Sequence, residues 1–164
     1  MTFSQSDQRR LDAAEGWVGL RNFREAALEL SALSTELQRH PAVLKVRWEI
    51  CSAEKDWQQA LEFASSLIEA TPNDPIGWVH RSYALHELKR TEEARDNLLR
   101  VVDQYPTIAT MRYNLACYEC QLGRPEQAKT WLEQAFALGD ARKMKLAAFD
   151  DPDLEPLWRK IGAA

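Results

Sequence analysis

The sequence lacks long apolar runs. No stretch approaches the roughly 20 apolar residues that a membrane-spanning helix needs, and the opening residues, MTFSQSDQRR, contain no apolar h-region of a secretory signal. Both absences predict a cytoplasmic protein without a membrane partner. With 164 residues, of which 45% are hydrophobic, the chain can bury one core. We therefore expect a single domain over residues 1–164.

Positive charge is not in excess either. The chain has 25 acidic and 21 basic residues, which gives a net charge of -4. Proteins that bind nucleic acid usually carry a basic patch, and anionic membrane surfaces attract the same charge. The sequence therefore predicts no nucleic-acid partner.

Catalytic motifs are also missing. The sequence contains no GxGxxG, GxxxxGK[ST], HExxH or GxSxG. The three histidines, His40, His80 and His86, have no nucleophile paired with them in the sequence. We expect neither an enzyme nor a cofactor.

Cysteine is scarce, but two of the three cysteines, Cys117 and Cys120, form a CxxC pair in the sequence CYEC. Such a pair can be a redox site or half of a metal site, or simply two small side chains one helical turn apart. An odd number of cysteines without an export signal favours reduced thiols. Which interpretation holds depends on the position of the pair in its helix.

A repeat of 34 residues is what the sequence does contain. Helix formers dominate, and four segments with related wording carry alanines spaced 34 apart: Ala26, Ala60, Ala94 and Ala128. Pro72 and Pro106 have the same spacing. A helix, a turn and a second helix within each 34 residues is typical of tetratricopeptide repeats. The small alanines would lie where two helices cross closely.

The chain resembles the tetratricopeptide repeat family over about residues 7–142. The third repeat matches best, through Trp78, Ser82, Leu85, Ala94, Leu98 and Pro106; departures are Trp48 where a small residue is usual, and Arg47 and Arg81 in place of Leu. The resemblance implies an all-α, right-handed α-solenoid of about four helix-turn-helix repeats with a C-terminal capping helix. The repeats would span about 7–40, 41–74, 75–108 and 109–142, with the cap at 143–164.

The expected helices follow from capping and helix-stop signals. Asn22, Asp56 and Asp74 have the spacing of N-caps, and Gly123 that of a left-handed C-cap. The predicted helices are 5–20, 23–37, 42–55, 57–70, 75–89, 92–104, 108–122 and 125–138. In the tail we expect a helix at 140–149, a capped turn at DDPDL and a helix at 155–161, with the exposed end of the solenoid sealed by Phe149, Leu154, Leu157 and Trp158.

The resemblance also implies a function, because proteins of this family typically bind peptides or extended segments in a concave groove lined by the first helix of each repeat. By repeat position, the groove residues here would be Lys45, Glu49, Ile76, Val79, His80, Tyr83, His86, Tyr113, Asn114, Cys117 and Cys120, with Leu11, Asp12, Glu15, Ser52 and Thr110 completing the lining. Tyr83 and Tyr113 would anchor the ligand. We expect an interaction scaffold or adaptor with a protein or peptide partner that the sequence does not identify.

Two narrower functions stay open, and one is excluded. A secretion-type chaperone has a similar size and acidity, and a thiol or zinc protein would use Cys117 and Cys120. The pair falls near the end of its helix, where the helix dipole does not favour a thiolate, and structural zinc needs four ligands, so we expect no metal. Chaperone-binding members grip a terminal carboxylate with Lys and Asn; here Lys45 is present, but Glu49 and His80 replace the asparagines, so no carboxylate clamp is expected.

Overall fold

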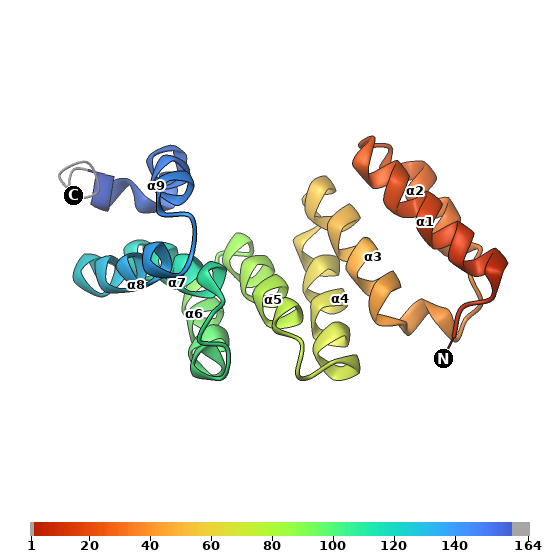
Figure 1. Ribbon diagram of the computed structural model, residues 1–164, viewed down its shortest axis with the longest axis horizontal. Helices are drawn as coiled ribbons and strands as arrows, with labels where there is room; N and C mark the ends of the chain where they lie inside the picture. Colours follow the sequence, from red (N-terminus) through yellow and green to blue (C-terminus); the bar gives the residue numbers. More distant parts are fainter. Residues whose placement is uncertain (1, 159–164) are drawn as a thin grey trace. The chain divides into compact units, whose positions relative to one another are not determined.

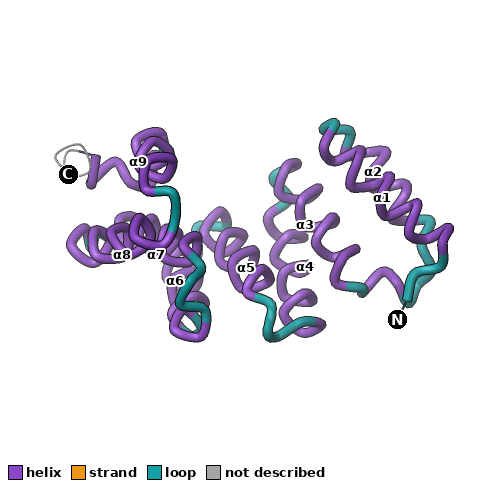
Figure 2. The backbone as a smooth tube through the Cα atoms, viewed as in Figure 1, coloured by secondary structure: helices purple, strands orange, loops and turns teal. Residues whose placement is uncertain are grey.

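The computed structural model describes residues 2–158, and this range contains helices and loops but no strand (Figures 1 and 2). The chain divides into two compact units, Met1–Ala84 and Leu85–Ala164. The first unit contains α1 (Gln5–Gly19), α2 (Phe23–Ser31), the 3₁₀ turn η1 (Leu37–Arg39), α3 (Pro41–Glu54), α4 (Trp57–Ala70) and most of α5 (Pro75–Glu87). The second contains the end of α5, then α6 (Thr91–Leu99), η2 (Val102–Gln104), α7 (Ala109–Gln121), α8 (Pro125–Leu138), α9 (Ala141–Asp150) and η3 (Pro152–Leu157). The all-α repeat fold is therefore confirmed.

Consecutive helices pack as pairs, α1 with α2 and α3 with α4 in the first unit, and α7 with α8 in the second (Figure 1). The four alanines of the 34-residue period lie in the second helices α2, α4, α6 and α8, and each is fully buried. Small side chains at these positions allow close helix crossings. A second close approach occurs at Gly77, where a Cβ atom would lie 2.9 Å from Cγ1 of Ile68. The packing thus confirms the repeat that the alanines predict.

The turn inside each repeat recurs with the same period. Arg21, Lys55, Lys89 and Gly123 are 34 residues apart, and their φ angles are 58, 61, 63 and 73°. In each turn the next residue donates its N–H to a carbonyl five residues back, as from Asp56 to Cys51 at 2.9 Å and from Arg124 to Glu119 at 2.8 Å. These are the left-handed ends typical of helices. The sequence predicted only Gly123, because the other three turns place a basic residue where glycine is usual.

Two predicted helices end earlier than expected. The helix predicted for 23–37 stops at Ser31, because the amide of Gln38 donates to the carbonyls of Leu30 and Leu33, both at 2.9 Å, and so satisfies groups at its end. The helix predicted for 92–104 stops at Leu99, and Val102 to Gln104 form a 3₁₀ turn instead. In both places buried apolar residues after the helix pull the chain off the helical path.

The first unit also absorbs one of the departures from the family pattern. Its core contains Leu11, Leu30, Val43 and Ile50 among other apolar residues. Arg47 does not leave a buried charge, because its guanidinium lies 5.7 Å from the centre of the Phe63 ring and bonds to Gln38. A long basic side chain can cover apolar surface in this way.

The tail seals the second unit, although with one residue fewer than predicted. Leu154 and Leu157 are buried, and the indole N–H of Trp158 donates to the Ala148 carbonyl at 2.8 Å. Phe149 is 40% exposed, so the prediction that it helps to seal the solenoid is wrong. Ala148, one residue earlier, is the α9 residue that faces inward. DDPDL leads into the 3₁₀ helix η3, not a separate turn, and the end of the predicted helix 155–161 lies outside the described residues.

Candidate functional site

The first helices of the repeats, α1, α3, α5 and α7, carry the predicted groove residues, and we call the surface that these residues form in each unit its first-helix face. In the first unit this face contains an aromatic cluster of Trp48, Trp57, His80 and Tyr83. The rings of Trp48 and His80 are stacked at 3.6 Å with an interplanar angle of 8°. Tyr83 meets Trp57 edge-on at 5.5 Å and Trp48 at 6.3 Å, and it remains 39% exposed. A large aromatic side chain is therefore held in place while part of its surface is open to a ligand.

A charged pair lies beside the aromatic cluster. The ammonium group of Lys45 is 2.9 Å from the Asp74 carboxylate, which also accepts the N–H of Ile76 at 3.0 Å and so caps α5. Burial opposes ionisation, but the Ile76 N–H and Lys45 together hold the pKa of Asp74 below its usual value. Lys45 is thus already paired within the chain, so it is not a free cation for a ligand carboxylate.

His80 is held neutral. Burial lowers its pKa to about 4, with Lys45 acting in the same direction and Asp74 opposing. Its ring can therefore serve as an uncharged aromatic surface at neutral pH. On α3, burial and the carboxylate of Glu15 raise the pKa of Glu49. Ile76 and Val79 are partly buried.

In the second unit the predicted groove residues are covered by the chain itself. Tyr113 donates its hydroxyl to Asp151 Oδ2 at 3.0 Å, and the Cys117 sulfur lies 3.6 Å from the same oxygen. His86 Nε2 lies 2.9 Å from Asp153 Oδ2, and its Nδ1 lies 3.0 Å from the Thr91 hydroxyl. His86 and Cys117 are buried in consequence. The structure therefore brings His86, Tyr113 and Cys117 together around an acidic segment of the tail.

The remaining predicted residues of this unit are Asn114, which is partly buried, and Cys120, which is buried. Burial raises the pKa of the Cys117 thiol well above its usual value, with Asp151 adding to the effect. Burial likewise raises the pKa of Cys120 to about 11. Redox chemistry and zinc ligation both use the thiolate, so the surroundings of the CxxC pair favour two protonated, packed thiols. Within residues 2–158 no group of three or more His, Cys, Asp or Glu side chains could hold a metal ion.

Sequence reasoning missed several residues of these faces. Trp48 had been considered only as a packing departure, and Trp57 belongs to a second helix, yet both hold Tyr83. Asp151 and Asp153 were expected in a capped turn, without partners on α5 or α7. The spacing of aromatic residues offered some signal for Trp48. No local pattern could have revealed the return of the tail onto α7.

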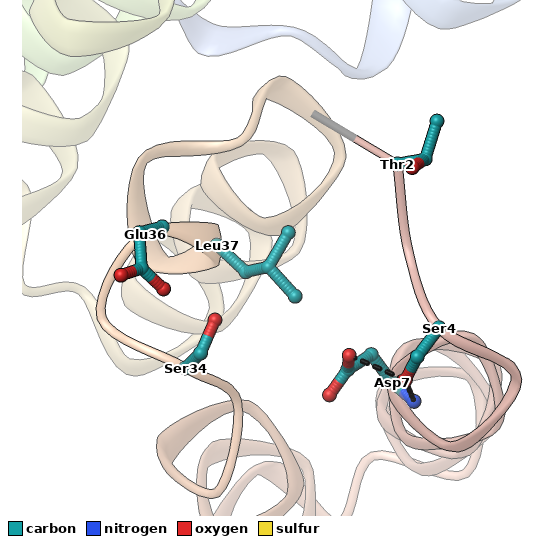
Figure 3. A pocket seen from close by; sticks show the side chains of 6 residues that line it. All are labelled: Thr2, Ser4, Asp7, Ser34, Glu36 and Leu37. Atoms are coloured by element: carbon teal, nitrogen blue, oxygen red, sulfur yellow. Dashed lines mark hydrogen bonds between the residues drawn. The ribbon is translucent and has the colours of Figure 1, made fainter.

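A hollow outside the predicted groove lies between the start of α1 and residues 34–37, and Figure 3 shows its lining of Thr2, Ser4, Asp7, Ser34, Glu36 and Leu37. Its polar groups have structural tasks. The Asp7 N–H donates to the Ser4 hydroxyl at 3.2 Å, and that hydroxyl donates to the Asp7 carboxylate at 2.6 Å, which caps α1. We assign no ligand to this hollow.

Comparison with known proteins supports the same fold. A tetratricopeptide repeat model matches residues 109–138, which span α7 and α8. Similar solved structures include TTC0263, a thermophilic tetratricopeptide repeat protein of Thermus thermophilus, at 20% identity and a TM-score of 0.76, covering 95% of this chain and 83% of that one. PilF of Pseudomonas aeruginosa has 20% identity and a TM-score of 0.75, with 95% and 69% covered. MamA of MSR-1 has 19% identity and a TM-score of 0.69, with 86% and 79% covered.

These identities are low, so the solved structures bear on the fold and not on a partner. Among the described helices, none combines the length and apolar character needed to cross a membrane. The family model, the shared fold and the 34-residue period of buried alanines and left-handed turns agree with one another. The chain is a tetratricopeptide repeat protein, with a fold that serves in general as a scaffold for protein–protein interaction.

Proposed function

We propose that this protein binds a peptide or partner segment through the first-helix faces of its repeats. The observation that carries the proposal is Tyr83, a large aromatic side chain that is 39% exposed and held by Trp48 and Trp57. Binding energy at protein interfaces concentrates in a few aromatic and arginine residues. A tyrosine that is already ordered loses little conformational freedom when it is covered.

The surroundings of Tyr83 favour a ligand with an apolar or aromatic side chain at this point. Trp48 and neutral His80 offer stacked rings, and Ile76 and Val79 extend the apolar surface along α5. The charged groups nearby, Glu49 and the Lys45–Asp74 pair, would adjust charge preference, because an exposed ion pair contributes roughly 1 kcal/mol or less. Since Lys45 is engaged by Asp74, recognition of a terminal carboxylate remains unexpected.

The proposal is tested by selecting peptides that bind the full-length chain from a displayed random library and measuring their affinity by fluorescence anisotropy. Tyr83→Ala should weaken binding by about 30-fold or more, which corresponds to the roughly 2 kcal/mol of a hot-spot residue. Leu28→Ala is the matched control in the same unit, because Leu28 is 53% exposed on a second helix. If Leu28→Ala abolishes binding and Tyr83→Ala has no effect, with both variants folded, the binding site lies on another face.

A further inference from the structure

The tail of the chain lies on the first-helix face of the second unit. We call residues 151–157, which are Asp151 and the helix η3, the resident segment. Asp151 is the extended residue that joins α9 to η3, with φ and ψ of -91° and 108°. Its carboxylate reaches Tyr113 and Cys117 on α7, and that of Asp153 reaches His86. Gln121 adds a bond from its amide to the Asp153 carbonyl at 3.3 Å.

Apolar contact fixes the same segment. Leu154 and Leu157 are 0% and 1% exposed, whereas Glu155 and Pro156 between them are exposed. Two buried leucines would be enough to cover an apolar end of a repeat array. The segment instead combines these anchors with two carboxylates, each bound by side chains of the first-helix face. This combination of apolar anchors and oriented polar contacts is how a bound peptide is recognised.

The residues that hold the carboxylates are also those that the repeat positions select for ligand binding. His86, Tyr113 and Cys117 all belong to the predicted groove, and all three contact Asp151 or Asp153. Burial raises the pKa of Tyr113, so its hydroxyl stays protonated and can donate to a carboxylate. The face therefore presents hydrogen-bonding side chains to an acidic segment.

We propose that the resident segment is an intramolecular ligand of this face, and that the face accepts partner segments of the same chemistry: two aspartates separated by one residue and followed directly by leucine. The proposal rests on the function proposed above, and it names the ligand class and the regulation of the second unit. A partner segment of this kind would compete with residues 151–157 for His86, Tyr113 and Gln121.

Competition with a tethered segment has a measurable consequence. A short connection gives the resident segment an effective concentration in the millimolar range or above. If it occupies nine-tenths of the molecules, a competing peptide binds with an affinity about ten-fold lower than it would to an open face. Weakening the resident segment should therefore strengthen binding in trans.

The experiment uses the full-length chain and a fluorescent peptide of residues 150–158, DDPDLEPLW. In the release variant, Asp151→Ala and Asp153→Ala remove the two carboxylates that the face holds. The control variant carries Asp150→Ala and Glu155→Ala, which remove the same charge from exposed positions of the same region. A second peptide carries alanine in place of both aspartates that correspond to 151 and 153.

The release variant should bind the peptide at least about ten-fold more tightly than wild type, while the control variant should bind like wild type. The alanine peptide should bind neither. If the release variant keeps its native circular dichroism but does not bind the peptide, the resident segment is a structural cap only. Equal binding by the release and control variants would also overturn the proposal.

A measurement on the wild-type chain covers the case in which the release variant does not fold. Saturating peptide should displace the resident segment and increase hydrogen exchange at the amides of residues 153–157. Unchanged exchange at saturation overturns the proposal. The affinity of library-selected peptides for Tyr83→Ala is a separate readout from the first unit, so failure here can be told apart from failure of the proposed function.

Discussion

Tyr83 and Cys117 occupy the same position in successive repeats, 34 residues apart, and yet their surroundings are opposite. Tyr83 lies in the first unit with 39% of its surface open, whereas Cys117 in the second unit is 6% exposed and lies against Asp151. Repeat position fixes the face of the helix on which a side chain lies. It does not determine whether that face is open, because the cover comes from residues outside the repeat.

The two faces also differ in what stabilises them. In the first unit the rings of Trp48 and His80 stack on each other and hold Tyr83 without help from a distant segment. In the second, His86 and Tyr113 are tied to carboxylates contributed by the tail. A change in the tail should therefore affect the second face directly, while the aromatic cluster responds to changes in its own helices.

The largest effect should come from opening the covered face of the second unit. Leu154→Ala removes a fully buried side chain of η3, and such substitutions cost about 2–5 kcal/mol of unfolding free energy. Urea denaturation followed by circular dichroism measures the loss. The control is Leu146→Ala on α9, where the side chain is 61% exposed, and it should change stability by no more than about 0.5 kcal/mol. Equal effects of the two variants would mean that the tail does not seal this face.

A somewhat smaller effect should appear at the alanines that the two units share. Ala60 in the first unit and Ala94 in the second are fully buried, so Ala60→Leu and Ala94→Leu should each destabilise by roughly 1–3 kcal/mol through overpacking. Thermal melting measures both, with exposed Ala27→Leu on α2 as the control. An unchanged melting temperature for only one of the two variants would show that the close helix crossing is not common to both units.

Acid should weaken the first unit through His80. Its pKa is about 4 in the folded protein against an ordinary value of 6.5, so between these pH values the unfolded state binds more protons. The stabilising contribution is complete above about pH 6.5 and is lost as the pH falls toward 4, with a size on the order of 1–2 kcal/mol after allowance for partial exposure.

His80→Phe keeps a ring beside Trp48 but cannot titrate, so the variant should lose less unfolding free energy than wild type between pH 7 and pH 4. Denaturant titrations at the two pH values measure the difference between the proteins. Glu49, whose pKa is raised, acts in the opposite direction and is present in both, so it does not contribute to that difference. Identical losses in the two proteins would refute a buried neutral His80.

The smallest effects should come from the left-handed turns. Lys55 in the first unit has a φ of 61°, a conformation that costs a non-glycine residue about 1–2 kcal/mol, so Lys55→Gly should raise stability by up to about 1 kcal/mol. In the second unit Gly123 has a φ of 73° with open space around it, so Gly123→Ala should lower stability by a similar amount through backbone strain alone. Melting curves give both signs, and a loss of stability in Lys55→Gly would contradict the backbone interpretation.

Much of the fold could be predicted from the sequence because each repeat is defined by contacts between residues that are close along the chain. Ala60, Ala94 and Gly123 marked the helix crossings and one turn correctly. The early end of α2 could not be predicted, because it depends on the Gln38 side chain turning back to the Leu30 and Leu33 carbonyls. The exposure of Phe149 depends in the same way on how α9 packs.

For the candidate site, the sequence by itself determined which residues of α3, α5 and α7 share the first-helix position, because helical periodicity and the 34-residue repeat fix that arrangement. Only the tertiary structure decided which of them are open. The stacking of Trp48 on His80 and the return of Asp151 and Asp153 to Tyr113 and His86 join residues that lie far apart along the chain. Such contacts depend on side-chain shape and hydrogen bonding in the folded chain, which no local pattern encodes.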